Sequence, residues 1–265
     1  MARSSRPTSN SPLAHIELID RLVVVARTLH APVSEMEVAL KESATNWKRL
    51  GETCLGQALY RHRSFFQNPS GTPAWSHTEL SYFRSMVPET ALLDLVANKH
   101  LAKVNLLRAE ILLTTPCSFI LPRDWQGMAD HSEKVASLEF IQVRPPYFEE
   151  YRNVMRDYCG PAAAKLVRAG KFGTFRAMET VAVLHRDPDI KADWNQIHLC
   201  ELNPNGFQGF GRVFEAALQD DRSNRADTSG VFAGLDRMRT VPRWTFNDPV
   251  IEMDVAVAQE GRAAK

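Results

Sequence analysis

The stretch "DWNQIHLCEL", Asp193–Leu202, alternates apolar and polar side chains in a way that predicts a β-strand. Side chains of a strand point alternately to its two faces, so Ile197 and Leu199 share one face. The opposite face carries a mixed set: Trp194, Gln196, His198 and Cys200. This set is too aromatic for an ordinary surface and too polar for an ordinary core. The fold and the function that we expect therefore depend on which part of the molecule this mixed face contacts.

The composition is that of an ordinary globular protein. The 265 residues are 44% hydrophobic and 24% charged, with a formal net charge of +1. No basic stripe with interleaved aromatics occurs, so no nucleic-acid partner is expected. No apolar run reaches membrane-span length, so no membrane partner is expected either. Four widely spaced cysteines without a CxxC pair favour reduced thiols in a cytoplasmic protein, with no metal site: Cys54, Cys117, Cys159 and Cys200.

The second half of the chain predicts the order β-α-β-β-α-β. Its elements are a strand over Ser137–Pro145, a helix over Tyr147–Gly170 with a kink or break at Pro161, a hairpin of strands over Phe172–His185 and Asp193–Leu202, a helix late in Asn203–Asp220, a polar stretch over Asp221–Gly230, and one or two strands over Val241–Ala258. Gly170 fits the residue after a helix end.

The first half predicts the same order. Its elements are a strand over Arg21–Thr28, a helix over Ser34–Gly51, a hairpin of strands over Thr53–Phe66 and Pro73–Arg84, a long amphipathic helix after Pro88 to Leu112, and a short strand over Thr114–Leu121. Both third strands open with tryptophan and carry a histidine soon after, Trp75 with His77 and Trp194 with His198. The repeat is one of pattern.

The duplicated pattern predicts an α+β fold of two tandem ferredoxin-like units. A sheet with both helices on one face leaves its other face bare, and two such faces can bury each other as an intrachain barrel. The expected organisation is a flexible N-terminus over 1–18, a first unit over 19–121, a linker over 122–136, a second unit over 137–258, and a flexible C-terminus over 259–265. The mixed face of the opening stretch would then point into the barrel.

Two motifs carry a resemblance to the dimeric α/β-barrel superfamily. They are "FIQVRPPYFEEYRNVM" (Phe140–Met155) and "ADWNQIHLCELNPNGFQGFGRVFEAAL" (Ala192–Leu218). The likeness is best over Ser137–Leu218 and is topological over Leu22–Leu121. The superfamily includes antibiotic-biosynthesis-type monooxygenases, EthD-like and NIPSNAP-like proteins, polyketide cyclases, chlorite dismutase relatives and haem-degrading monooxygenases. The resemblance implies a shared fold and a central pocket, without fixing a reaction.

Strand alternation selects the residues expected inside the barrel. On the second unit these substrate-binding candidates are Phe140, Gln142, Met178, Trp194 and Gln196, with Arg176 and His198 as catalytic candidates. On the first unit, Trp75, His77 and Glu79 share one strand face. A register error of one residue would invert any of these sets.

His198 is the leading catalytic candidate. An imidazole in a partly dry cavity could act as a general base, with Gln196 or Arg176 holding a developing oxyanion. The alternative is a core histidine bonded to a neighbouring carbonyl. A buried Arg176 would need an anion, which could be an acidic ligand or a structural partner such as Glu139 or Glu201.

The remaining candidates have structural alternatives as well. His77 and Glu79 could form a carboxylate-oriented base or could lie on a solvated hairpin. Trp75 and Trp194 could stack on a flat substrate or could anchor the packing. Cys200 has no evident activator and is expected to be inert.

Three hypotheses follow. The first is a cofactor-independent enzyme, a cyclase, lyase or monooxygenase, acting on a hydrophobic, aromatic or polyketide-like molecule through His198. The second is haem binding or haem degradation, with His100 or His198 as axial ligand. The third is a non-catalytic protein that binds a small ligand. A homodimer through the outer helices is compatible with each.

Overall fold

The computed structural model describes residues 21–30, 38, 53–67, 75–97, 104–115, 134–191, 193–208, 210–219 and 228–254. The predicted termini, the linker before residue 134, Cys117, His100 and all but Val38 of the predicted first helix lie outside the described residues. Among the described residues, no helix combines the length and apolar character that a membrane span requires.

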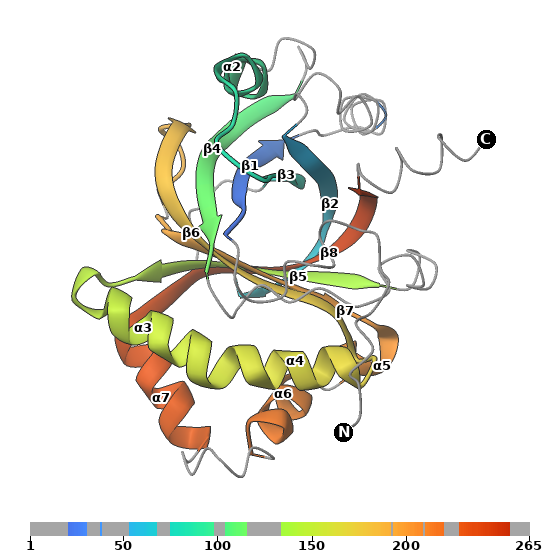
Figure 1. The fold of residues 1–265 in the computed structure, drawn as a ribbon, viewed down its shortest axis with the longest axis vertical. Helices are drawn as coiled ribbons and strands as arrows, with labels where there is room; N and C mark the ends of the chain where they lie inside the picture. The colour runs from blue at the N-terminus through green and yellow to red at the C-terminus, as the bar shows by residue number, and fades with distance from the viewer. Residues whose placement is uncertain are drawn as a thin grey trace, which may run out of the picture.

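Eight strands form a closed barrel in the order β1-β3-β2-β8-β5-β7-β6-β4 (Figure 1). The strands are β1 (Val23–His30), β2 (Cys54–Gln67), β3 (His77–Phe83), β4 (Asn105–Thr114), β5 (Val135–Val143), β6 (Phe172–Arg186), β7 (Gln196–Leu202) and β8 (Arg239–Asp254). Every neighbouring pair is antiparallel. Each half contributes four adjacent strands with its first and third strands in the middle. The mixed α/β class and the antiparallel sheet expected from the sequence are confirmed.

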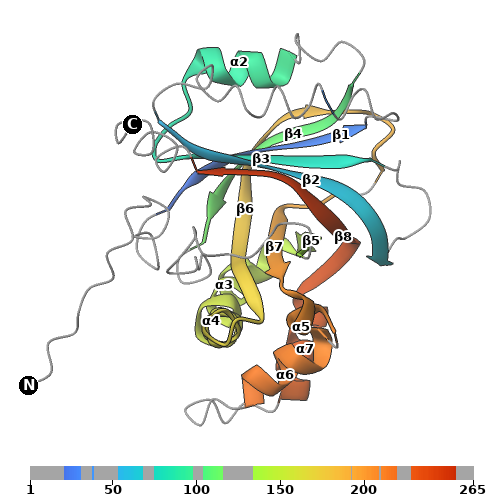
Figure 2. The same ribbon diagram turned by 90° about the vertical axis from the view of Figure 1, so that its right-hand side faces the viewer.

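The described helices lie outside the barrel. They are α2 (Glu89–Ala97), η4 (Pro145–Tyr147), α3 (Phe148–Val154), η5 (Met155–Cys159), α4 (Gly160–Arg168), α5 (Pro204–Phe207), α6 (Phe210–Gln219) and α7 (Thr228–Met238). Helix α2 covers the strands of the first half, whereas α3 to α7 form a layer beneath those of the second half (Figures 1 and 2). The second half therefore has a sheet with a barrel face and a helix-covered face.

The predicted long helix after Pro88 is wrong in its second part. Helix α2 ends at Ala97, and Asn105–Thr114 is strand β4, which pairs with β1 and β6. Leucine, alanine, glutamate and arginine favour helices by intrinsic propensity. Pairing on both edges satisfies the backbone of this segment, and that tertiary context overrides the propensity.

Helix α7 was not predicted. The residues up to Gly230 read as a polar stretch, but the chain is helical over Thr228–Met238 and enters β8 directly at Arg239. The helix buries Val231, Leu235 and Met238 against the helix layer. These three residues recur at helical spacing. The two glycines of the segment and its position after a polar run make that spacing difficult to recognise in the sequence.

The helix expected over Tyr147–Gly170 is interrupted, as Pro161 suggested. Residues Met155–Cys159 form one turn of π-helix between α3 and α4. Pro161 stands in the first turn of α4, where its missing N–H disrupts the regular ladder. Gly170 follows the helix end with φ of 66°, which confirms its capping role.

The described residues form three buried clusters. The first occupies the barrel interior and includes Leu138, Phe140, Ile197 and Leu199. The second lies between the sheet of the second half and helices α3 to α7. The third lies under α2 and includes Phe83 and Leu95. A barrel of eight strands is just wide enough for side chains to fill, so its interior is a packed core.

The predicted orientation of β7 is therefore inverted. Ile197 and Leu199 point into the barrel, and Cys200 lies in the helix-side cluster together with the Phe175 and Ala177 side chains of β6. The orientation predicted for β6 is correct, because Met178 lies in the barrel cluster. Strand β3 is inverted like β7, with Leu80 in the barrel. The barrel takes the aliphatic faces of β3 and β7, although it also holds the buried Arg176 of β6. The mixed face of β7 is thereby left to the helix layer.

Candidate functional site

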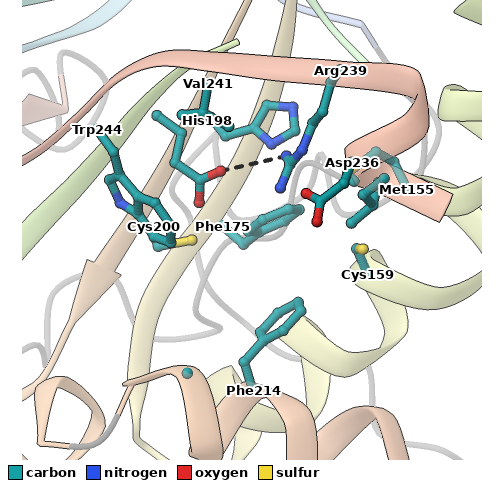
Figure 3. Close-up of a pocket in the computed structure, with 13 residues that line it drawn as sticks. Met155, Cys159, Phe175, His198, Cys200, Phe214, Asp236, Arg239, Val241 and Trp244 are labelled. Atoms are coloured by element: carbon teal, nitrogen blue, oxygen red, sulfur yellow. Dashed lines mark hydrogen bonds and ion pairs between the residues drawn. The ribbon is translucent and has the colours of Figure 1, made fainter. Parts of the chain in front are cut away.

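A cavity of about 240 Å³ lies on the helix side of the second half, between the sheet and the helix layer. Its lining residues come from β5 to β8, the π-helical turn, α6 and α7. They are Glu139, Met155, Cys159, Phe175, His198, Cys200, Gly211, Phe214, Leu235, Asp236, Arg239, Val241 and Trp244 (Figure 3). Most of this wall is apolar, and a few polar groups converge on it, which is the usual constitution of a small-ligand site.

The floor of the cavity is made by two rows of side chains across the sheet. Trp244, Glu139 and His198 are register partners on β8, β5 and β7. Cys200 and Phe175 are partners in the next row, on β7 and β6. Alternate residues of a strand share a face, so both rows point toward the cavity. The floor therefore combines the polar groups of Glu139 and His198 with aromatic and sulfur-bearing side chains.

The π-helical turn supplies part of the roof. Met155 and Cys159, its first and last residues, are buried and both line the cavity. Single π-helical turns inside α-helices occur frequently at functional sites. The irregular turn thus coincides with the one wall of the cavity that is built from the first helix of this half.

Arg239 and Glu139 form the charged pair of the cavity. Arg239 Nη1 lies 3.5 Å from Glu139 Oε2, the ion pair drawn in Figure 3. The same nitrogen donates to Tyr151 Oη over 2.9 Å. Tyr151 is fully buried and holds the guanidinium from the α3 side. The long distance to the carboxylate indicates a weak pair.

Burial raises the pKa of the Glu139 carboxyl, and the positive charge of Arg239 opposes this rise. A carboxyl group whose pKa moves upward approaches the range in which it can both take up and release a proton near neutral pH. Glu139 is thus the lining residue with the properties of an acid/base group.

His198 is held neutral. Its ring is buried between Tyr151 and Phe175, with ring centroids 6.0 and 6.2 Å away, and Nε2 lies 3.1 Å from Gln196 Oε1. Burial, followed by repulsion from Arg239, lowers the pKa of His198 to about 3. An imidazole with so low a pKa is a weak general base, although it can still donate or accept a hydrogen bond.

Both thiols of the cavity are held protonated. Burial raises the pKa of Cys159 to about 12, and burial raises the pKa of Cys200 well above its ordinary value. The thiolate is the reactive form of cysteine, so neither group is an activated nucleophile. They contribute apolar, polarisable surface to the floor and the roof.

The location predicted for His198 and Gln196 is wrong. Both were expected inside the barrel, but they lie on the opposite face of the sheet, under the helices. Gln142, predicted beside them, is half-buried, and its Oε1 is buried without a hydrogen-bond partner among the described residues. The imidazole is sheltered from water as expected, but by the helix layer.

The aromatic candidates do point into the barrel, where they pack on one another. The Trp75 and Phe140 ring centroids are 4.8 Å apart, and that of Trp194 lies 5.1 Å from Phe140. Trp194 also donates from Nε1 to Glu110 Oε1 over 2.7 Å. Together with Met178, which is fully buried, these residues form a packed core and act as anchors.

Trp194 points inward although Gln196, two residues on, does not. The residue between them interrupts the alternation, because Asn195 bonds to the neighbouring strand through its side chain. Asn195 Oδ1 accepts from Val143 N over 2.9 Å, and Nδ2 donates to Val143 O over 2.8 Å. The regular strand begins after this clamp.

Arg176 and the His77–Glu79 pair lie elsewhere. Arg176 is buried in the barrel and donates from Nη1 to Tyr82 Oη over 2.7 Å. Glu79 accepts from Arg27 Nε and Nη2 over 3.1 and 2.7 Å, and Arg27 also donates to Leu95 O of α2. The His77 ring contacts Ser76 Oγ over 2.8 Å. These candidates therefore do not share a site with His198.

Sequence reasoning missed the charged pair of the cavity. Glu139 is an ionisable residue within the apolar run "SLEFIQV", and that isolation was the available signal. Arg239 had no such signal, because it follows α7, which was not predicted. Met155 and Cys159 were expected on a helix, but the alternation of the strands could not relate them to a cavity.

Metal or haem binding finds little support in the residues present. Among the described residues, no group of three or more His, Cys, Asp or Glu side chains is arranged around a possible metal ion. The cavity volume is below the roughly 300–1,000 Å³ of pockets for drug-sized ligands, and a porphyrin is no smaller than such a ligand. His198 already uses Nε2 toward Gln196. The cavity beside His198 therefore does not fit a haem group.

No family model matches the chain, and no curated protein shows significant sequence similarity to it. The fold is similar to solved structures. A candidate monooxygenase from Fusobacterium nucleatum subsp. nucleatum has a TM-score of 0.52 at 9% identity, over 91% of this chain and 96% of that one. A candidate monooxygenase from Lactobacillus acidophilus NCFM has 0.49 at 11%, over 89% and 96%. A mutant chlorite dismutase from Candidatus Nitrospira defluvii has 0.49 at 11%, over 92% and 96%. At these identities the likeness concerns the fold alone, a ferredoxin-like α/β arrangement.

Proposed function

We propose that the chain is a small-molecule enzyme whose active site is the cavity on the helix side of the second half. Glu139 is its proton-transfer group. The observation that carries the proposal is a carboxyl group with a raised pKa on the wall of a largely apolar cavity. Proton transfer by a positioned carboxyl group is a common mode of catalysis, and a raised pKa suits it to neutral pH.

The other lining groups have supporting roles in this proposal. Phe175, Phe214 and Leu235 form walls that hold an apolar substrate and exclude water. Neutral His198 offers a hydrogen bond to a substrate oxygen, in place of the base expected from the sequence. No organic cofactor is needed for such proton transfer.

Three reactions are compatible with this chemistry: cyclisation, a lyase step that starts with proton abstraction, and oxygenation of an activated substrate. Each begins by removing a proton from the substrate, which Glu139 can accept. Oxygenation is included because a solved structure with a similar fold is named a candidate monooxygenase, which supports this part of the proposal. In that case the deprotonated substrate supplies the electrons that reduce dioxygen.

Replacement of Glu139 tests the proposal. The purified protein is incubated in D₂O with small apolar ketones and carboxylic acids, and deuterium uptake at carbon is followed by NMR. Glu139→Gln keeps the shape of the side chain but removes the titrating proton. We expect the variant to lose exchange by about 10²- to 10⁴-fold, the usual contribution of general acid/base catalysis.

Glu150→Gln is the matched control, because Glu150 is an exposed carboxylate of α3 that does not line the cavity. It should exchange like the unmodified chain. Exchange that survives in Glu139→Gln would remove Glu139 from the mechanism. Binding of these compounds without any exchange would favour the non-catalytic ligand-binding function.

We also propose that the barrel arose from two tandem ferredoxin-like units in a single chain. In both halves the strand order is fourth, first, third, second, and the halves meet at the β2–β8 and β6–β4 pairs. The same order of strands in each half supports a duplication. After it, the second half kept the cavity described above.

A further inference from the structure

We infer that the cavity recognises a small apolar carboxylate, whose carboxylate group binds the guanidinium of Arg239. This inference rests on the proposed function of the cavity and names the chemical class of its ligand. The groups that carry it are the incompletely bonded guanidinium, its weak pairing with Glu139, and the apolar walls around them.

The guanidinium of Arg239 has unused donors. A guanidinium carries five N–H groups, and both polar contacts of Arg239 in the described part of the chain use Nη1. Nε is buried without a hydrogen-bond partner there. The side chain lines the cavity and has an exposed fraction of 13%. A mostly buried cation with unpaired donors is costly unless an anion completes it.

The unused donors form one edge of the guanidinium. Nε and Nη2 point the same way and match the two oxygens of a carboxylate, which is the bidentate arrangement that arginine favours. Figure 3 shows the Arg239 side chain reaching into the lined space beside the His198 ring. An incoming carboxylate can therefore accept from Nη2 while Nη1 stays on Tyr151, and it reaches the buried Nε once the guanidinium turns toward the cavity.

Glu139 compensates the charge of Arg239 poorly. The pair has one contact of 3.5 Å, at the limit of a hydrogen bond, and burial favours the protonated form of Glu139. The other ionisable groups lining the space are Asp236, on an exposed turn of α7, together with neutral His198 and the two protonated thiols. A monoanionic ligand would thus supply a close anionic partner for the Arg239 guanidinium, whose one ion pair among the described residues is the long contact to Glu139.

The rest of the ligand must be small and apolar. Trp244, Phe175, Phe214 and Leu235 form the wall beyond the charged pair, and the volume is about 240 Å³. A short aliphatic or single-ring aromatic acid suits this space. In such a ligand, the carbon next to the carboxylate would lie near Glu139, the proposed proton-transfer group.

Paired probes test the inference. Hexanoate and phenylacetate are compared with hexanamide and phenylacetamide, which have the same shape without charge, by titration calorimetry. The unmodified chain should bind each acid at least about tenfold more tightly than its amide. Arg239→Gln should lose this preference while amide binding stays the same. Arg237→Gln is the matched control, since Arg237 is exposed and pairs with Glu150 outside the cavity lining.

Arg239→Lys keeps the inference testable if the glutamine variant does not fold. Lysine retains the charge but lacks the planar fork, so we expect weaker acid binding with unchanged amide binding. Equal affinity for acids and amides, a preference that survives both variants, or no binding of any probe would overturn the inference. Acid preference without proton exchange would instead overturn the proposed function alone, and exchange without acid preference would overturn this inference alone.

Discussion

His198 and Glu139 face each other across β7 and β5, and burial moves their pKa values in opposite directions. Burial disfavours the charged form of each group, so the histidine loses its proton more easily and the carboxyl group holds its proton more tightly. The result is a neutral imidazole beside a carboxyl group with a raised pKa, within one row of the sheet. The alternation of apolar and polar residues in β7 indicates His198 as a candidate. It does not indicate which face of the strand is shielded from water.

His198 should make the fold sensitive to acid. Its pKa in the folded chain is about 3, against an ordinary value of 6.5. Its contribution to stability is therefore fully present above pH 6.5 and is lost as the pH falls toward 3. Between pH 7 and 4 the unmodified chain should lose on the order of 3 kcal/mol more free energy of unfolding than His198→Gln.

Urea unfolding at a series of pH values measures this difference. Glu139 contributes with the opposite sign, because its pKa is raised, but it is present in both proteins and cancels in the comparison. Parallel pH dependence of the two proteins would show that the ring of His198 is not held neutral by burial.

Among the elements, the π-helical turn links the first helix of the second half to the cavity. Helix α3, the turn and α4 pack on the sheet through Tyr151, Met155, Cys159 and Leu166. A π-helical turn contains one residue more than an α-helical turn would, so the flanking helices keep their faces toward the sheet. The extra residue brings both ends of the turn, Met155 and Cys159, to the cavity wall.

Deletion of Asp157 should convert this turn into regular α-helix. Asp157 is exposed, pairs with its neighbour Arg156, and is not part of the buried cluster under the helices. We expect thermal stability to stay within about 1 kcal/mol while ligand affinity for the cavity falls, because surface changes cost little. Asp157→Ala, which keeps the residue count, should leave affinity unchanged. Equal ligand affinity in the deletion variant and in Asp157→Ala would show that ligand binding does not depend on the π-helical turn.

Strands and helices were predictable where their local pattern agreed with the fold. Strands β1, β5 and β6 lie where the sequence predicts strands, and the break at Pro161 follows from its missing N–H. Strand β4 was not predictable from its local pattern, because its residues are good helix formers. Its conformation depends on strand partners far away in the sequence. Helix α7 was hidden by glycines that its packing tolerates.

In the whole molecule, closure of the barrel explains why the site lies outside it. Every residue of β3 and of β7 is buried, so both faces of these strands are covered. The alternation of side chains along these strands then identifies two faces. It does not indicate which face points into the barrel. Trp75 from the first half meets Phe140 and Trp194 from the second in the barrel core. That packed core leaves the small cavity to the layer between sheet and helices.

Two methionines report on the two possible locations of a ligand. Met155 lines the cavity, and Met178 lies fully buried in the barrel core. Methyl NMR spectra of the chain with labelled methionines are recorded while phenylacetate is added. We predict that the Met155 methyl resonance shifts with saturation and that the Met178 resonance does not move. A saturable shift of Met178 with Met155 unchanged would contradict the account and return the site to the barrel.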